Sequence, residues 1–429
     1  MNEAKHSRRD FWQNIAIVAL SLSAVILFAQ TQLYNLASTT IGQYLDQLLE
    51  TPAQAEHTAS TQISALSHPV HVAVTGVYGR FGDMTMVTSG ETFRPLNDLL
   101  KEALGSARVY TVCSEGEFLE SLNSTSIYYD FLTSLPLSVL ADTDTAATGS
   151  GIQARRLILS DQGERGVQLY IQDSSGTYQY CSTAVSRGDL ESAADGYELG
   201  NAVFAFELAK TDSTYASLDP CSLFLSDVIP SFPVLQASQT PADSNQLLTA
   251  LSFNPRTNYR YPESDGTEVI VEGERSLRIR PDGTLLYRSG GETALTIDTA
   301  DPDLPTMQEA AAGSNMLLQK LMNNSGDGQL YLQSIQQVED TTVLQFDYHA
   351  GSIPIRFSDG SCAAEVTLTG STVSALTLRF RQYAFSGESS LLLPLRQALA
   401  IAVQNRGTDL SIGYADNGTE TLAACWLTE

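Results

Sequence analysis

The sequence lacks the short motifs that mark the common classes of enzyme. It contains no phosphate-binding P-loop, no GxGxxG, no HExxH and no GxSxG. Histidine is scarce, with five residues in 429, so a Ser–His–Asp set has little to draw on. His68 and His71 would point to opposite faces of a strand, and we expect the isolated His349 at the surface or in a turn. We therefore expect no catalytic residue, no metal ion and no cofactor, and we predict that the protein is not an enzyme.

Basic residues are scarce as well. The chain has 24 Lys and Arg against 49 Asp and Glu, which gives a formal net charge of −25. Nucleic-acid binding needs basic side chains that neutralise phosphates, so this balance argues against a nucleic-acid partner. The simplest interpretation of the acidity is that it keeps the protein soluble.

The five cysteines show no CxxC pair and no spacing that is typical of metal ligands. Their number is odd, so at least one stays unpaired within the chain. Outside the cell, Cys181–Cys221 and Cys362–Cys425 are the disulfides to consider, and unpaired buried cysteines are at least as good an interpretation. The sequence leaves the pairing open.

Charge is absent from one long stretch, residues 11–45. Its apolar centre and flanking aromatic residues predict a transmembrane helix over residues 12–34, because about 20 mostly apolar residues cross a bilayer. Basic residues precede this helix and none follows closely. The positive-inside rule then places residues 1–11 in the cytoplasm and the C-terminal bulk outside the cell, with a single-pass anchor in the lipid bilayer of the cell membrane. A cleaved signal peptide is the alternative, but the first suitable cleavage site lies far beyond the apolar core.

Two candidate partner contacts belong to this N-terminal region. Within the helix, Ser21 and Ser23 are small enough for close helix packing, with Leu22 and Ile26 beside them; alternatively, the serines simply face lipid. Residues 35–68 are predicted to form a juxtamembrane helix and a linker. A heptad-like stripe in the helix predicts a stalk that packs on a partner helix or folds back on its own domain. The stripe consists of Ala37, Ile41, Tyr44 and Leu48.

Beyond the linker, strand and helix signals alternate without a repeating βαβ pattern. We predict an α+β fold, with two or three extracytoplasmic domains of antiparallel sheets with packed helices. The predicted domains are an N-terminal α+β domain (residues 69–218), a linker helix with a β-meander (219–300) and a C-terminal α+β domain (301–429). In the last of these, a helix at Thr306–Met322 precedes five strands, including one run from Val373 to Tyr383.

The clearest local pattern is the meander. Asp265-Gly266 and Asp282-Gly283 are tight-turn signals, and the runs around them predict three antiparallel strands with one solvated face. Four arginines there form a candidate surface for an anionic ligand or a partner: Arg275, Arg278, Arg280 and Arg288. The alternative is a solvated strand face with cross-strand pairs to Glu268 and Glu272.

Several blocks of the sequence resemble, in the same order, the YycH family of membrane-anchored regulators from Gram-positive bacteria and its sister family YycI. The blocks are Ser126–Phe131, Leu135–Leu137, Phe253–Pro255, Tyr259–Tyr261, Asp265–Thr267, Gly273–Ile279, Asp282–Gly283, Leu286–Tyr287, Phe346–Tyr348, Gly351–Ile355 and Trp426. None of them is a catalytic signature, and the likeness lies in the order of strands and turns.

This resemblance implies a regulatory function. Such proteins dock on a membrane sensor histidine kinase of a cell-wall-related two-component system, through the membrane helix and the outside domains, and set its activity. A YycI-like sister protein is a second implied partner. An extracytoplasmic binding module for a cell-wall fragment or peptide is the alternative, and an extracytoplasmic enzyme or protease-inhibitor-like domain is a third hypothesis.

Overall fold

The structure, a computed structural model, describes most of the chain from residue 66 onward. The described residues are 66–85, 91–141, 151–197, 200–226, 231–239, 244–254, 256, 259–290, 294–322, 326–403 and 408–428. All of them lie within the unit Ala59–Glu429. No helix in these ranges is long and apolar enough to cross a membrane.

The predicted cytoplasmic tail, transmembrane helix and stalk lie outside the described residues. The same holds for the partner contacts that we predict there: Ser21, Leu22, Ser23, Ile26, Ala37, Ile41, Tyr44 and Leu48.

The first part of the described chain forms a seven-stranded antiparallel sheet. In order across the sheet, its strands are β2 (Gly79–Asp83), β1 (His71–Gly76), β4 (Ser126–Pro136), β5 (Gln153–Asp161), β6 (Val167–Gln172), β7 (Tyr178–Ser182) and β3 (Arg108–Val112). The sequence predicts strands here, from the alternation of Val70, Val72 and Val74 and from the runs Arg156–Leu159, Val167–Ile171 and Tyr178–Cys181. They are confirmed in β1, β5, β6 and β7.

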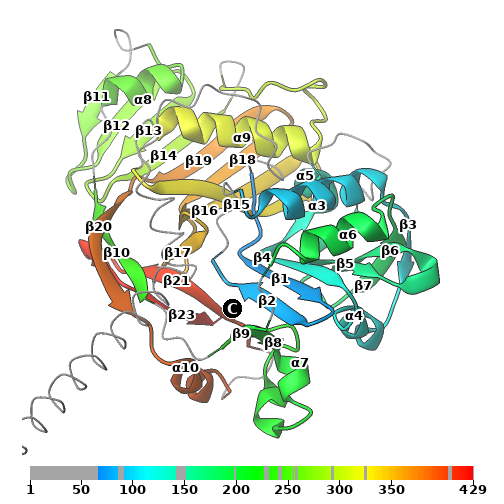
Figure 1. Cartoon of the computed structure of the whole chain (residues 1–429). Coiled ribbons are helices and arrows are strands. Elements are labelled where there is room, and N and C mark those ends of the chain that lie inside the picture. Colours follow the sequence, from blue (N-terminus) through cyan, green and yellow to red (C-terminus); the bar gives the residue numbers. More distant parts are fainter. Residues whose placement is uncertain are drawn as a thin grey trace, which may run out of the picture. The chain divides into compact units, whose positions relative to one another are not determined.

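The two faces of this sheet differ, because successive side chains of a strand point to opposite sides. One face is apolar and includes Val72, Tyr129 and Leu157. Helices α3 (Arg94–Ser106) and α6 (Arg187–Ala194) pack together and cover it (Figure 1), and the Tyr129 hydroxyl donates to the Leu96 carbonyl of α3 at 2.7 Å. The opposite face carries polar side chains and is partly covered by α4 (Glu115–Ser121).

Short elements surround this sheet. They are α5 (Leu137–Leu140), the 3₁₀ turns η1 (Gly163–Arg165) and η2 (Ser213–Ser217), the strand pair β8 (Ala202–Phe204) and β9 (Leu223–Leu225), and α7 (Ala205–Leu208). A separate three-stranded sheet consists of β20 (Gln382–Leu391), β10 (Ser231–Ser238) and β22 (Thr421–Leu422).

The second large sheet has eleven strands, and all its pairs are antiparallel except β17–β21. Ten strands follow one another across it: β11 (Tyr259–Pro262), β12 (Glu268–Glu272), β13 (Arg275–Ile279), β14 (Thr284–Ser289), β19 (Thr372–Arg379), β18 (Ala364–Thr369), β16 (Thr341–Ala350), β17 (Ile353–Phe357), β21 (Leu410–Asp416) and β23 (Ala424–Thr428). The eleventh strand, β15 (Gly328–Val338), pairs with β16 along its length.

One face of this sheet is the core of the C-terminal part. A row of directly paired residues across it is buried: Ile270, Leu277, Tyr287, Leu376, Val366, Leu344 and Ile335. Helices α8 (Ser244–Ala250) and α9 (Met307–Leu321) pack over this side (Figure 1). The next row, on the other face, is mostly polar: Arg278, Thr377, Glu365 and Gln345 belong to it, together with Leu286 and the buried Val269. We call this side the open face.

Local chemistry explains why these elements form. Helix α9 begins with a capping box, in which Thr306 and Glu309 satisfy each other's backbone N–H groups. In the meander, the carboxylates of Asp265 and Asp282 accept hydrogen bonds from the backbone N–H groups two residues on, at 2.9 Å each. The glycines that follow them have φ values of 87° and 81°, which only glycine adopts at low cost.

The predicted α+β class with antiparallel sheets and packed helices is confirmed, and so are the meander and the helix at Thr306–Met322. The run from Val373 to Tyr383 is divided between β19 and β20, which belong to different sheets. The meander also joins the C-terminal strands, because β14 pairs with β19. The domain boundary that we predict near residue 300 therefore falls within one continuous sheet.

The five cysteines are all unpaired in the structure. Neither Cys181–Cys221 nor Cys362–Cys425 forms, so the structure agrees with the alternative of unpaired cysteines. Burial raises the pKa of the Cys113 thiol to about 11 and that of Cys181 to about 12, which keeps both protonated and unreactive at neutral pH.

Candidate functional site

The polar face of the seven-stranded sheet holds a buried arginine at its centre. Arg156 on β5 lies directly opposite Asp130 on β4, and Asp130 lies opposite His71 on β1. All three side chains are buried, and Arg156 has 0% of its surface exposed. A charge at such a position is costly unless other groups compensate it.

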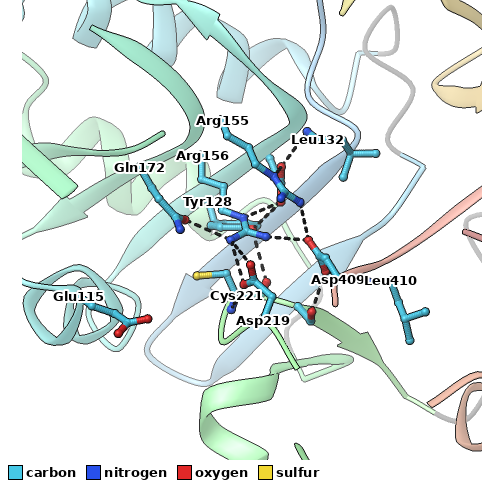
Figure 2. A network of polar contacts seen from close by, with 12 residues as sticks. Glu115, Tyr128, Leu132, Arg155, Arg156, Gln172, Asp219, Cys221, Asp409 and Leu410 are labelled. Carbon is cyan, nitrogen blue, oxygen red and sulfur yellow. Dashed lines mark hydrogen bonds and ion pairs between the residues drawn. The ribbon is translucent and has the colours of Figure 1, made fainter. Parts of the chain in front are cut away.

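Compensation comes from residues far away in the sequence (Figure 2). Arg156 Nε donates to Asp130 Oδ2 at 2.7 Å, Nη2 donates to Asp409 Oδ2 at 2.6 Å, and Nη1 lies 2.9 Å from both carboxylate oxygens of Asp219. Nη1 also donates to the Gln172 side chain at 3.1 Å. The planar guanidinium thus uses all three of its nitrogens, which a lysine could not do.

Arg155 joins the same group of charges. It pairs with Asp130 at 3.3 Å and with Asp409 at 2.7 Å. Neighbouring residues on a regular strand point to opposite faces, but the β4–β5 pairing is irregular between Asp130 and Leu135. Leu132 lies in this irregular stretch with a φ of 60°, and its N–H donates to Asp130 Oδ1. We call Arg155, Arg156, Asp130, Asp219 and Asp409 the arginine–aspartate network.

The network contains two guanidiniums and three carboxylates, and these affect one another's ionisation. Burial opposes the charged form of Asp130, but Arg155 and Arg156 outweigh it and hold the pKa of that carboxyl well below its usual range. Burial raises the pKa of Asp219 despite the nearby Arg156. Burial also lowers the pKa of His71, against the opposing effect of Asp130 and Asp409, so His71 is neutral at neutral pH.

This arrangement fastens three segments of the chain together. Asp219 and Asp409 belong to neighbouring segments, since the Asp219 N–H donates to the Thr408 carbonyl at 3.1 Å and the Ser222 hydroxyl donates to Asp409 Oδ1 at 2.7 Å. Both segments lie against β4 and β5. Since each of its charged groups is bonded to another, the network can act as a structural junction. Among the described residues, no group of three or more His, Cys, Asp or Glu could hold a metal ion.

A second polar cluster lies where the described chain begins. His68 Nε2 is 3.3 Å from His349 Nδ1, and Tyr331 packs against both rings, with its ring centroid 4.3 Å from that of His68 and 5.0 Å from that of His349. His349 Nε2 in turn lies 3.2 Å from the Gln333 side-chain nitrogen. The expectation of a surface or turn position for His349 is wrong, because this residue is buried within β16.

The meander arginines do not form one surface. Arg275 shares the core face with Leu277 and is buried: its guanidinium lies 4.8 Å from the centre of the Phe253 ring and pairs with Glu272. Its inclusion in the predicted surface is therefore wrong, since residues 275 and 278 of one strand face opposite sides. Arg278 and Arg288 lie on the open face and are exposed.

The expected cross-strand pairs to glutamates are confirmed only in part. Glu272 pairs with Arg275, as that alternative has it, but Glu268 pairs with Arg260 of β11. Arg278 pairs with Glu263 in the β11–β12 turn. Within the part of the chain that the structure describes, Arg280 and Arg288 form no ion pair.

Sequence reasoning missed the arginine–aspartate network, although the sequence carries a signal for it. Arg155 and Arg156 adjoin the apolar run Leu157–Leu159, and Asp130 interrupts the run of aromatic residues in Ser126–Phe131. Charged residues inside such buried strand patterns need opposite charges close by. Nothing in the sequence pairs them with Asp219 and Asp409, which lie 63 and 253 residues from Arg156.

Comparison with known proteins gives no relative: no family model, no curated protein and no solved structure matches the chain.

Proposed function

We propose that this protein is a membrane-anchored extracytoplasmic regulator that modulates a sensor histidine kinase of a cell-wall-related two-component system by contact. The resemblance of its ordered strand and turn blocks to the YycH family motivates the proposal. The anchor is the predicted helix over residues 12–34, and the contacts are those predicted in the membrane and the stalk. In this proposal the protein performs no chemistry itself and acts by binding one kinase state more tightly than the other.

One structural observation supports this proposal above the others. The last residues of the predicted linker, Leu66–His68, and the two residues that follow contact both large sheets. The Leu66 carbonyl accepts from the Leu332 N–H of β15 at 2.8 Å, and the Val70 N–H donates to the Asp130 carbonyl of β4 at 2.8 Å. A displacement of the linker would therefore act on both sheets, which is what a regulator that couples its anchor to its outside domains requires.

The deciding experiment is co-purification from native membranes. The full chain is compared with a variant in which residues 12–34 are replaced by an unrelated apolar helix of the same length. We expect a sensor histidine kinase to co-purify with the full chain and to be lost with the variant. Ser21→Leu with Ser23→Leu is the finer test, because it changes only the predicted small-residue contact. If no kinase is recovered with the full chain, the proposal fails.

A second candidate function is an extracytoplasmic binding module for a cell-wall fragment or peptide. The observation that favours it is the exposed group Arg278, Arg280 and Arg288 on a chain of net charge −25. The neighbouring edge strand β11 adds the exposed Tyr259 and Tyr261, whose ring centroids are 5.5 Å apart. Binding of purified anionic cell-wall polymer to the full chain, and its loss in the double variant Arg280→Ala with Arg288→Ala, would establish this function.

A further inference from the structure

The segment Leu66–Val70 is held by an unusual chain of hydrogen bonds that ends at its histidine. Arg356 on β17 donates to the Gln333 side-chain oxygen at 3.2 Å, so the Gln333 nitrogen is a donor toward His349 Nε2, 3.2 Å away. His349 Nε2 is then an acceptor and its Nδ1 carries the hydrogen, which it donates to His68 Nε2 at 3.3 Å. In this series of hydrogen bonds, each donor points toward His68 and each acceptor points toward Arg356.

This directionality leaves no ring nitrogen that can take a proton without losing a hydrogen bond, although the Ser352 backbone weakly favours the charged forms. A proton on His349 Nε2 would face the N–H donors of Gln333, and a proton on His68 Nε2 would face the N–H of His349. Because its Nε2 accepts, neutral His68 already carries its hydrogen on Nδ1, which is buried and makes no hydrogen bond in the described part of the chain. Protonation of either ring therefore breaks a hydrogen bond instead of adding one.

We propose that the His68–His349 pair makes the seat of Leu66–Val70, meaning the contacts that fix this segment to β15, pH-responsive: proton uptake releases the segment from β15. The release removes one link between the two large sheets, which also contact each other directly through β4 and β15. The proposal rests on the proposed function, because it describes how the coupling between the linker and the outside domains would be regulated. It concerns the contacts that fix the first described residues to β15.

None of the charged and titratable groups around the pair stabilises a positive charge on either imidazole. From β15 the pair is faced by Tyr331, whose pKa burial raises to about 12, so it stays neutral. From β17 it is faced by Arg356, a cation that opposes a second positive charge on His349. The nearest carboxylate, Asp347 of β16, is engaged by Arg356 at 2.7 Å. No carboxylate among the described residues contacts either imidazole.

The direction of the pH effect follows from the ionisation of the two rings. Burial lowers the pKa of His68 from 6.5 to about 4 and that of His349 well below its usual value, while the Ser352 backbone favours the charged forms more weakly. The seated state therefore binds fewer protons than the released state. Below pH 6.5 the ratio of released to seated molecules rises by about tenfold for each pH unit and each histidine that titrates, until the pKa of the seated state is reached.

Amide hydrogen exchange on the full chain in detergent micelles tests this directly. Two peptides report on the seat: one covers Leu66–Val70 and the other covers Leu332, whose amide donates to Leu66. A peptide from Leu157–Ile171 of the β5–β6 pair is the internal reference. After correction for intrinsic exchange, we expect protection in the two seat peptides to fall at least about tenfold between pH 7.5 and pH 5.5, with the reference unchanged.

Variants assign the effect to the pair. The double variant His68→Gln with His349→Gln should show the same seat protection at both pH values, and His57→Gln should behave as the unaltered chain does. Equal protection at pH 7.5 and pH 5.5 in the unaltered chain would overturn the inference, even if the double variant does not fold. A simultaneous loss of protection in the reference peptide would also overturn it, because the release would then be global unfolding.

This outcome is separate from that of the kinase experiment. A seat that does not respond to pH leaves the co-purification result unaffected. Absence of a kinase partner, conversely, leaves a pH-dependent release of Leu66–Val70 fully measurable.

Discussion

Two sets of arginines on antiparallel strands differ in burial: one set is buried and the other is exposed. Arg155 and Arg156 of β5 are enclosed by three aspartates that come from β4 and from two distant segments. Arg278 and Arg288 of the meander lie on the open face in contact with water. Both sets occur within strand patterns, so local pattern alone does not decide whether a charge is buried. The supply of compensating charges from elsewhere in the chain decides it.

The two large sheets show the same contrast on a larger scale. Each has one apolar face covered by helices. The second face of the seven-stranded sheet is covered by α4 and by the segments that carry Asp219 and Asp409, so its polar groups must satisfy one another. The row Gln345, Glu365 and Thr377 on the open face is only partly buried, and there water can serve as the partner. The polar face of the seven-stranded sheet therefore forms a junction between segments, and the open face of the eleven-stranded sheet is an accessible surface.

The largest expected effect comes from breaking the network at its centre. Arg156→Met keeps the approximate length of the side chain but leaves Asp130, Asp219 and Asp409 without their shared partner. Breaking a buried ion pair costs about 3–5 kcal/mol, and we expect a loss in that range in the free energy of unfolding, measured by urea denaturation at pH 7. A loss below about 1 kcal/mol would mean that the network is not the junction described here.

A double-mutant cycle sharpens this result. Asp409→Asn removes one of the three carboxylates, so part of its cost should disappear when Arg156→Met is already present. We expect the two changes to be non-additive by about 1 kcal/mol or more. Additive effects would show that Arg156 and Asp409 do not stabilise each other.

Much of the fold follows from the sequence, for identifiable reasons. Alternation and tight-turn pairs such as Asp282-Gly283 are local signals, and they locate the meander strands and the strand β1 correctly. Helix α9 lies where the sequence places a helix, at Thr306–Met322, and its capping box between Thr306 and Glu309 is likewise a local interaction. These features depend on interactions between residues that are close in sequence.

The features that sequence reasoning missed depend on distant contacts. The chain leaves one sheet after β19 and joins another at β20, which pairs with β10. The apolar pattern of the sequence continues through Phe380–Arg381 and gives no sign of this break. His349 has the appearance of an isolated polar residue until His68, 281 positions earlier, is placed beside it. The arginine–aspartate network is invisible for the same reason. The wet face of the meander was predictable, but the inward direction of Arg275 required strict period-two counting along β13.

Acid should destabilise both polar clusters, and variants can separate their contributions. Burial lowers the pKa values of His68, His71 and His349, so the unfolded chain binds more protons and stability falls as the pH drops from 6.5 toward about 4. Each histidine contributes at most about 1.4 kcal/mol for each pH unit within this window. The raised pKa values of Asp83, Asp219 and Asp347 act in the opposite sense at the acid end.

The free energy of unfolding at pH 7.0 and pH 5.5 measures this slope. His71→Gln removes the contribution of the histidine beside the network, and His68→Gln with His349→Gln removes that of the seat. We expect the double variant to lose more of the pH dependence than His71→Gln, since it removes two titrating groups. A larger reduction from His71→Gln would place the acid sensitivity in the network and would count against the seat.

A smaller effect distinguishes Arg275 from the other meander arginines. Arg275→Ala removes a guanidinium that stacks on Phe253, donates to the Ser252 carbonyl and pairs with Glu272. Loss of this packing and hydrogen bonding should cost about 2 kcal/mol, measured by urea denaturation. If Arg275→Ala changed the free energy of unfolding by no more than an exposed substitution does, Arg275 would belong with the exposed meander arginines after all.

The smallest effect is expected for Arg288→Ala, and it is the test of the exposed half of the comparison. Arg288 lies opposite Ser276 on the open face and is exposed. Surface substitutions of this kind change the free energy of unfolding by no more than about 0.5 kcal/mol. The same measurement in 0.5 M salt should give the same difference within error, because no close ion pair is lost. A cost above about 1 kcal/mol would mean that Arg288 is packed as Arg156 is, and the contrast between the two sets of arginines would fail.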